Sequence, residues 1–405
     1  MAVHFNIGEL FWQLCRTDNP DGLWKIIDRL AISHPLYSEE ISPEEILRMA
    51  SSIALYGAGK FSEAVIDSWG KQGLKPDYCI DSDDRKWGTS IGDIQIIDPR
   101  VLFQNENPPL VVIAAMATNE IEEILEGWNI PYLYAERDGS VGYFSGHWLS
   151  RHRLEFDRVY CALSDDESRH VLLEVVKARM FQRYHFPMRG NYFSAEVALY
   201  PQYFREDIFT FSEPELFVDC GAFDGDTLIA FAAIMQRLGR FQWSAVALEV
   251  DKQNVSRIQS NLMLYGVDRA KIICAAVGKD NSVASSSSYF NCQQSAERCE
   301  VQSVSLDKVL LGASPTFIKM DIEGYEVDAL AGAKEIISAC HPKLAICSYH
   351  TSSQLLEVPL FILDNFPNYR LYIRHHSAGT LWETVCYAAT EKNTCNTLKI
   401  RNGYV

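Results

Sequence analysis

Strand-length apolar segments alternate with amphipathic helices in two stretches of this chain, over residues 50–135 and again from residue 215 onward. Segments such as SIALYGAG, LVVIAA, ELFVDCGAFDGDT and TFIKMDIEG read as strands, and most of them run into glycine or acidic residues. Strands that alternate with helices form parallel sheets, because each helix carries the chain back across the sheet before the next strand begins. The sequence therefore predicts an α/β protein with two doubly wound, Rossmann-like sheets.

The second series ends differently from the first. Its last two strands, YRLYIRHHS and ETVCYAA, lie close together in the sequence and are typical of a hairpin. We therefore expect a mostly parallel second sheet that ends in a terminal antiparallel strand.

A chain of 405 residues is long enough for two hydrophobic cores. Between the two series the strand pattern stops, and DESRHVLLEVVKARMFQRYHF predicts one long helix with Ser164 as its N-cap. The predicted organisation has four parts: a helical lead-in (1–48), a Rossmann-like domain (49–135), a mainly helical bridging region (136–214) and a domain built on the second sheet (215–405).

Charge and hydropathy narrow the range of partners. The formal net charge of −16 disfavours nucleic acid, and no cluster of Lys and Arg along the chain predicts a local basic face. The N-terminal MAVHFNIGELFWQLCR does not resemble a secretion signal, and no stretch reaches the roughly 18 uninterrupted apolar residues that span a bilayer. We expect a cytoplasmic protein with a small-molecule substrate and no membrane partner. The sequence carries no signal for the oligomeric state.

The segment FVDCGAFDGDT is the most informative one for function. A buried strand delivers Asp219 and then turns through Gly221, Ala222 and Gly225 into a helix. Glycines let the backbone approach a ligand, and open α/β sheets bind ligands at the carboxyl ends of their strands. A glycine turn of this kind also occurs for purely structural reasons, so the turn alone does not assign a ligand.

Acidic residues in this turn indicate which ligand it favours. Asp224 and Asp226 would repel a pyrophosphate at the helix N-terminus, whereas they would attract a cation. S-adenosylmethionine carries a sulfonium and an amino group, so a glycine turn with carboxylates suits it better than it suits a nucleotide phosphate.

The next two strand ends complete the predicted donor site. Glu249 and Asp251 end the strand AVALEVD, and Glu249 is our candidate for binding the two ribose hydroxyls. A solvated strand-end carboxylate is the alternative. The following strand, ICAAVG, ends in Ala275 and Ala276, whose small side chains leave room for an adenine ring, although small residues also serve plain packing.

Candidate catalytic groups follow the last parallel strands. TFIKMDIEG ends in Asp321 and Glu323, and one of these acids could accept a substrate proton or bind the donor's amino group, while the other caps the next helix. LAICSYH places His350 at another strand end, where a histidine is a typical general base. We predict no metal: His375 and His376 are adjacent, so on a strand they point to opposite faces, and no C-x-x-C pair occurs among the eleven cysteines.

Residues 214–390 resemble the FkbM-type methyltransferases. The similar stretches are FVDCGAFDGDT, ALEVDKQNVSRIQSNL, AAVG, VSLDKVL, FIKMDIEGYEVDALAGA, SYHTSSQLLEVPLFI and YRLYIRHHSAGTLWETVCYA, in the same order and spacing. The resemblance implies a class I methyltransferase fold and S-adenosylmethionine-dependent methyl transfer to a hydroxyl oxygen of a small molecule or sugar.

The resemblance also assigns residues. It implies that Gly221, Ala222, Asp224 and Gly225 line the donor, that Glu249 holds its ribose and that Asp321 lies near the transferred methyl group. The chain departs from the family where Glu249-Val250-Asp251 replaces the frequent Glu-Pro-Asp. The general base stays open between Asp321 and His350.

The first sheet supports a competing hypothesis. YGAGKFSEA contains Gly57 and Gly59, but Ser62 stands where a third glycine would complete the dinucleotide fingerprint, and Asp81 lies near the distance expected for a ribose acid. The segment resembles nucleotide-binding-type domains fused to sugar-modifying enzymes. The alternative function is therefore an NAD- or nucleotide-linked oxidoreductase or binding protein that uses the first sheet.

Overall fold

A computed structural model describes residues 13, 17–33, 47–48, 50–104, 108–115, 119–128, 130, 132–135, 146–180, 184–185, 202–280, 283–285, 300–377 and 381–395. The chain divides into two compact units. The first contains Met1–Asp157, His170–Asn191 and Ala378–Leu381, and the second contains Arg158–Arg169, Tyr192–Ser377 and Trp382–Val405.

The first unit contains a mostly parallel sheet. Its order within the described residues is β3-β4-β2-β1-β5-β6-β7, with parallel pairing from β4 through β6 and an antiparallel strand at each edge. The strands are β1 (Ile53–Tyr56), β2 (Tyr78–Ile80), β3 (Ser90–Ile91), β4 (Ile94–Ile97), β5 (Leu110–Ile113), β6 (Tyr132–Ala135) and β7 (Tyr184–His185). The predicted α/β alternation is present, while a nucleotide-binding identity for this unit stays a prediction.

The described helices between residues 20 and 178 are α2 (Pro20–Ser33), α4 (Lys60–Gly70), α5 (Asn119–Gly127), α6 (Gly146–Arg151), α7 (Arg153–Ala162) and α8 (Asp166–Ala178), with 3-10 turns η2 (Asp84–Lys86) and η3 (Pro99–Gln104). Helices α4 and α5 lie between strands of this sheet in the sequence, whereas α2 falls in the predicted lead-in and α6, α7 and α8 fall in the predicted bridging region. Outside α2, most of the predicted lead-in lies beyond the described residues.

The long helix predicted in the bridging region is shorter than expected. It ends at Ala178, and Tyr184–His185 pairs with β6 as a strand. Its N-terminus is capped by Asp165, which accepts the Ser168 N–H at 2.7 Å, and not by Ser164, whose N–H bonds to Leu371. The helical pattern of apolar residues past Ala178 was therefore misleading.

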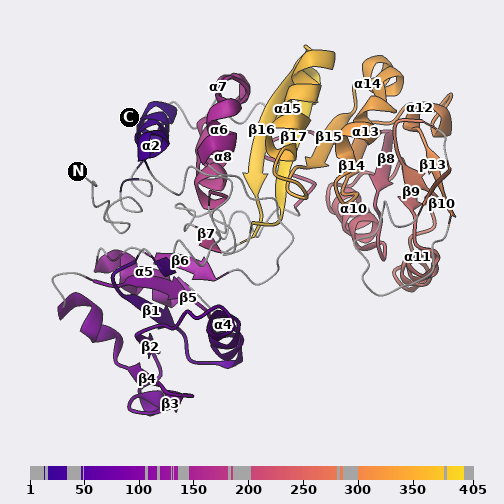
Figure 1. Cartoon of the computed structure of the whole chain (residues 1–405). Coiled ribbons are helices and arrows are strands. Elements are labelled where there is room, and N and C mark those ends of the chain that lie inside the picture. Colours follow the sequence, from indigo (N-terminus) through magenta and orange to yellow (C-terminus); the bar gives the residue numbers. More distant parts are fainter. Residues whose placement is uncertain are drawn as a thin grey trace. The chain divides into compact units, whose positions relative to one another are not determined.

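The second unit contains the larger parallel sheet, in the order β10-β9-β8-β14-β15-β17-β16 (Figure 1). The strands are β8 (Glu215–Cys220), β9 (Trp243–Glu249), β10 (Ala270–Cys274), β14 (Phe317–Met320), β15 (Lys343–Cys347), β16 (Tyr369–His375) and β17 (Thr384–Thr390). All neighbours pair in parallel except β17, which is antiparallel to both β15 and β16. The predicted mostly parallel sheet is confirmed, with the last strand of the chain antiparallel; this strand, β17, lies between β15 and the edge strand β16.

The helices of this sheet connect its strands in two directions from the centre. They are α10 (Asp226–Arg237), α11 (Lys252–Leu264), α12 (Leu306–Val309), α13 (Glu326–Ala331), α14 (Lys334–Cys340) and α15 (Gln354–Asn365), with η5 (Glu391–Asn393) after β17. From β8 the chain proceeds outward to β9 and β10, whereas from β14 it proceeds the opposite way to β15. Right-handed connections therefore place α10–α11 and α13–α15 on opposite faces, and the border between β8 and β14 is the topological switch point where such sheets bind ligands.

One predicted strand is divided in two. The segment ICAAVG leaves the large sheet after β10, and Ala276–Val277 form β11 in a small sheet with β13 (Glu300–Val304) and β12 (Val283–Ser285). The main chain leaves the large sheet at Ala275. There the Ala275 N–H still bonds to the carbonyl of Glu249, the last residue of β9.

A cluster of aromatic rings fixes the centre of the large sheet. Phe204, Phe217, Phe231 and Phe317 are buried, and their neighbouring ring centroids lie 4.8–5.6 Å apart. Burial of each such side chain is worth about 1.5–3 kcal/mol. The cluster therefore holds the segment before β8 against β8 and β14, which carry the site described below.

Within the described ranges, no helix is both long enough and apolar enough to cross a membrane.

Candidate active site

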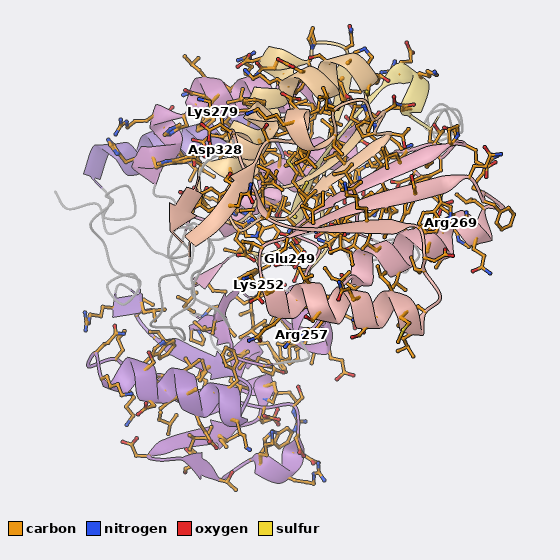
Figure 2. All side chains as sticks on the ribbon, turned by 90° about the vertical axis from the view of Figure 1, so that its right-hand side faces the viewer. Glu249, Lys252, Arg257, Arg269, Lys279 and Asp328 are labelled. Atoms are coloured by element: carbon orange, nitrogen blue, oxygen red, sulfur yellow. The ribbon has the colours of Figure 1, made fainter. Side chains whose placement is uncertain are left out.

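A cavity of about 520 Å³ lies in the second unit at the switch point between β8 and β14. Figure 2 shows Glu249 where β9 turns into α11, at the end of the sheet opposite Arg269. Side chains from the ends of several strands and from nearby loops line the cavity: Gln202, Tyr203, Gly221, Phe223, Asp226, Thr227, Leu248, Glu249, Val250, Asn254, Ala275, Ala276, Val277, Lys319, Asp321, Ile322, Glu323 and Glu383.

Gly221 is required where the first and fourth strands of the series end. Its φ is +79°, and a Cβ at this position would lie 1.9 Å from the carbonyl oxygen of Asp321. The Gly221 N–H bonds to the Leu248 carbonyl at 2.9 Å, and the Asp321 N–H bonds to the Cys220 carbonyl at 3.0 Å. No larger residue fits here, because the turns after β8 and β14 touch each other.

Glu249 lines the same cavity from the end of β9. Its Oε2 accepts the Phe223 N–H at 2.9 Å and its Oε1 accepts the Asp251 N–H at 2.8 Å. These bonds fix the carboxylate and use one acceptor position on each oxygen, so each keeps a further lone pair for a ligand. Ala276, from the next strand, is also in the cavity wall.

Several predicted donor-binding residues lie outside the cavity wall. Asp219 is fully buried, with its Oδ1 3.0 Å from Lys319 Nζ. Asp251 is the N-cap of α11 and accepts the Gln253 N–H at 2.6 Å. Ala222, Asp224 and Gly225 shape the turn without lining the cavity.

Asp321 accepts two tyrosine hydroxyls and faces one imidazole ring, from two segments of the chain. Tyr203 donates its hydroxyl to Oδ2 at 2.9 Å, Tyr349 donates to Oδ1 at 3.2 Å, and His350 Nε2 lies 3.3 Å from Oδ1. Burial alone would raise the pKa of Asp321, but the contact with His350 and the charge of Lys319 hold that pKa well below its usual range. Asp321 is therefore ionised and a weak proton acceptor.

His350 lies between two carboxylates. Its Nδ1 is 3.0 Å from Glu326 Oε1, and its Nε2 faces Asp321. Burial would lower the pKa of His350, but the attraction of Asp321 and Glu326 outweighs it and raises the pKa to about 10. A protonated imidazole has no free lone pair, so this raised pKa makes His350 better suited to pair with the two carboxylates than to accept a proton.

Asp321, Glu326 and His350 come close enough together to resemble a metal site. The two carboxylates, however, approach opposite nitrogens of the imidazole ring. One ion cannot bind both nitrogens of one ring, and a protonated histidine is no ligand. The geometry fits an ion-paired triad better than a metal centre.

Negative charge dominates the cavity wall. Five carboxylates line it, those of Asp226, Glu249, Asp321, Glu323 and Glu383. The ammonium of Lys319 is also there, but it is paired with Asp219. An anionic ligand would meet net repulsion in this cavity, whereas a cation would be attracted.

The two adjacent histidines that the sequence offered as candidates, His375 and His376, are hydrogen-bonded within the fold. His375 Nδ1 lies 2.9 Å from Thr384 Oγ1, and His376 Nε2 lies 2.5 Å from the Tyr387 hydroxyl. Burial, aided by the charge of Arg205, lowers the pKa of His376 well below its usual value. Neither residue belongs to the described cavity wall.

Sequence reasoning missed one side of the cavity. Gln202 and Tyr203 precede β8, in the segment assigned to the bridging region, and Glu383 precedes the antiparallel strand β17. These residues do not follow a parallel strand, so the strand-end rule could not identify them. Glu383 opens the predicted strand ETVCYAA, inside a stretch that resembles the family, so an acid at the start of a buried strand was a signal that could have been used.

The strand-end acid of the first unit has a different environment. Asp81 Oδ1 accepts the Asp83 N–H at 2.9 Å, while Oδ2 accepts the Ala58 N–H and the Lys86 ammonium, each at 2.8 Å. Ser62 bonds to the Gly57 and Ala114 carbonyls. These contacts tie the glycine turn to its own sheet.

Residues 219–377 match the methyltransferase FkbM domain family. This match runs from the end of β8 through β16 and includes most of the cavity wall, and it supports S-adenosylmethionine-dependent methyl transfer in general terms. It does not include Gln202, Tyr203 or Glu383. No curated protein matches the chain.

Solved structures bear out the fold. The chain is similar to methyltransferase FkbM from Methylobacillus flagellatus KT, with a TM-score of 0.61, 23% identity, and coverage of 91% of this chain and 98% of that one. At this identity the likeness shows a shared fold. Precorrin-6y C5,15-methyltransferase from Geobacter metallireducens GS-15 (TM-score 0.29, 13% identity, covering 44% of this chain and 82% of that one) and the O-methyltransferase from Bacillus cereus (TM-score 0.30, 11% identity, 44% and 74%) are too distant to carry an argument.

Proposed function

We propose that this protein transfers a methyl group from S-adenosylmethionine to a hydroxyl oxygen of a small molecule or sugar. The observation that carries the proposal is the convergence of Gly221, Glu249, Ala276 and Asp321, from four separate strand ends, on one cavity at the switch point of the sheet. The FkbM domain match supports the reaction class.

The cavity has properties that a sulfonium nucleoside needs. Its volume lies within the 300–1,000 Å³ typical of small-molecule sites. Glu249 offers carboxylate lone pairs to ribose hydroxyls, and the Ala275–Ala276 wall leaves space for a flat base. Acidic side chains complement the sulfonium and the ammonium of the donor, whereas phosphate groups would be repelled.

The donor supplies an already activated methyl group, so the protein's contribution is chiefly orientation. The Gly221 turn permits close approach of the backbone, and Glu249 holds one end of the ligand. Asp321 lines the cavity and is fixed by Tyr203 and Tyr349 beside His350, so its negative charge can orient the donor's cationic groups.

Calorimetry with S-adenosylhomocysteine tests donor binding. We expect a heat of binding for the wild type and its loss in Gly221→Val, because the new side chain would overlap the Asp321 carbonyl. Gly59→Val is the matched control: this glycine opens a helix in the first unit, and a Cβ added to it would have no neighbouring atom within 4 Å, so the heat should be unchanged. Equal heats in the wild type and Gly221→Val would exclude the site.

The same titration with NAD separates the competing function. An NAD heat that Gly59→Val removes, together with no heat from S-adenosylhomocysteine in the wild type, would favour a nucleotide-linked role for the first unit. We expect the opposite pattern, since the family match lies in the second unit.

A further inference from the structure

Glu383 lines the cavity in an unusual backbone conformation. Its φ is +71°, and the His376 N–H donates to its carbonyl oxygen at 3.0 Å. A left-handed conformation in a residue other than glycine is strained and persists only where the surroundings enforce it, often at functional sites. The position of this carboxylate at the cavity is therefore maintained at a cost to the fold.

The two bases expected from the sequence are both unsuited to accepting a proton. The two ring nitrogens of His350 face Asp321 at 3.3 Å and Glu326 at 3.0 Å, so neither is directed at the centre of the cavity as a free acceptor. Asp321 already accepts hydrogen bonds from Tyr203 and Tyr349 and faces the His350 cation, so its remaining basicity is low. Another group must therefore accept the proton of the substrate hydroxyl.

The four remaining carboxylates of the cavity wall differ in their surroundings. Asp226 accepts both the N–H and the hydroxyl of Thr227 on one oxygen, at 2.7 and 3.2 Å. Glu249 binds two main-chain N–H groups, and Glu323 has a side chain that is 67% exposed and lies 3.8 Å from His350. Glu383 is partly buried, and Gln202 donates its amide to one oxygen, Oε2. Gln202 thus orients the carboxylate and leaves Oε1 as the oxygen for a substrate.

We infer that Glu383 is the general base that accepts the proton of the acceptor hydroxyl, an inference that rests on the proposed methyl transfer to oxygen. The acceptor oxygen forms a bond to the methyl carbon as the carbon–sulfur bond breaks, and that bond's electron pair stays on sulfur, giving a neutral thioether. The hydroxyl proton moves to Oε1 of Glu383 and then to water, so charge and atoms balance.

The charges around Glu383 suit this role. Burial raises the pKa of Glu383 and the negative charge of Asp321 raises it further, while the Gln202 hydrogen bond and the charges of His350 and Lys319 oppose the shift. A base is most effective when its pKa lies nearer to the working pH than that of an ordinary carboxylate. His376 donates its main-chain N–H to the carbonyl of Glu383, and burial lowers the pKa of its ring well below the usual value, which disfavours a positive charge there.

The first test needs no acceptor. The protein is labelled with ¹³C at glutamate carboxyl carbons, saturated with S-adenosylhomocysteine and titrated by NMR, and the Glu383 resonance is assigned by its absence in Glu383→Gln. We expect it to titrate above the usual glutamate value of 4.5. Titration at or below 4.5 would overturn the inference.

The second test measures transfer of ¹⁴C-methyl from S-adenosylmethionine to the small-molecule fraction of extract from cells that produce the protein. Glu383→Gln should lower the rate about 10²- to 10⁴-fold and remove the rise of the rate with pH, while Glu383→Asp should keep a measurable rate. Glu391→Gln is the matched control, because this glutamate is 80% exposed at the far end of β17 and pairs with Arg370. A Glu383→Gln rate and pH profile equal to the wild type would contradict the assignment.

Calorimetry distinguishes failure of the proposed methyl transfer from failure of the role assigned to Glu383. S-adenosylhomocysteine should still bind Glu383→Gln, with at most a small loss of affinity from the one missing charge, because Glu383 is placed on the acceptor and not in contact with the donor. No heat in the wild type would remove the proposed function itself. A normal heat with a Glu383 that titrates like an ordinary carboxylate would remove only its role as the base.

Discussion

At the carboxyl end of β2, Asp81 accepts three N–H groups, from the main chain of Ala58 and Asp83 and from the ammonium of Lys86. At the carboxyl end of β9, Glu249 accepts two, both from the main chain, and lines a cavity. Both acids follow the second strand of an α/β series that began with a glycine turn. The acid bound by a neighbouring cation stabilises its own loop, whereas the acid bound only by the backbone keeps capacity for a ligand.

The glycine turns themselves do not distinguish the two sheets. Gly57 and Gly221 both have positive φ, and a Cβ on either would collide with the carbonyl of the neighbouring strand end, that of Ala114 or Asp321. In both places glycine is needed because two backbone segments lie very close together. Ligand binding is therefore decided by the side chains around the turn and not by the turn.

The largest expected difference between the two sheets concerns their cation–acid pairs. His350→Gln should lower the free energy of unfolding by about 3–5 kcal/mol, because Asp321 and Glu326 lose a buried partner. Lys86→Gln should cost at most about 1 kcal/mol, since the Lys86 side chain is 38% exposed. Urea denaturation at pH 7 measures both, and equal losses would contradict the contrast.

A pH series sharpens the same contrast. The pKa of His350 is raised from 6.5 to about 10 in the folded protein, so its stabilisation is complete below pH 6.5 and is lost as the pH rises through 10. The difference in unfolding free energy between the wild type and His350→Gln should therefore shrink by up to about 4–5 kcal/mol over this interval. A constant difference from pH 6 to pH 10 would mean that His350 is neutral in the fold.

The strand-end acids give the next largest effect. Glu249→Gln should weaken S-adenosylhomocysteine binding about 10- to 100-fold, since a hydrogen bond to a charged group is worth about 1.5–3 kcal/mol. Asp81→Asn is the counterpart in the first sheet and should leave the affinity unchanged, because Asp81 is occupied by Lys86. Calorimetry measures both affinities. A similar loss of affinity in the two variants would contradict the conclusion that only the second sheet binds the ligand through its strand-end acid.

The sequence was sufficient to predict both α/β sheets and the antiparallel end of the second. Alternation of strands and helices fixes the strand direction, and the short connection before ETVCYAA fixes the hairpin. It was not sufficient for ICAAVG, because a residue pattern does not reveal that the main chain leaves the sheet at Ala275. Local pattern predicts elements well and predicts their breaks poorly.

Part of the site could be predicted from the alternation of strands and helices as well. Strand ends of a parallel sheet meet at one edge, which brought Gly221, Glu249 and Asp321 to one cavity. Glu383 lies at the same edge because β17 is antiparallel, so its amino end adjoins the carboxyl end of β15. The ionisation of His350 could not be predicted, since it depends on Asp321 and Glu326 from other elements.

The smallest expected effect concerns the second acid after β9. Asp251 accepts the Gln253 and Asn254 N–H groups as the N-cap of α11 and lies outside the described cavity wall. Asp251→Ala should therefore cost about 1 kcal/mol of stability, as the loss of a cap usually does, and should leave S-adenosylhomocysteine affinity unchanged. Urea denaturation and calorimetry on the same preparation test this. A loss of affinity as large as that of Glu249→Gln would instead mean that Asp251 contacts the donor. Both acids at the end of β9 would then bind the ligand, in contrast to Asp81 at the end of β2.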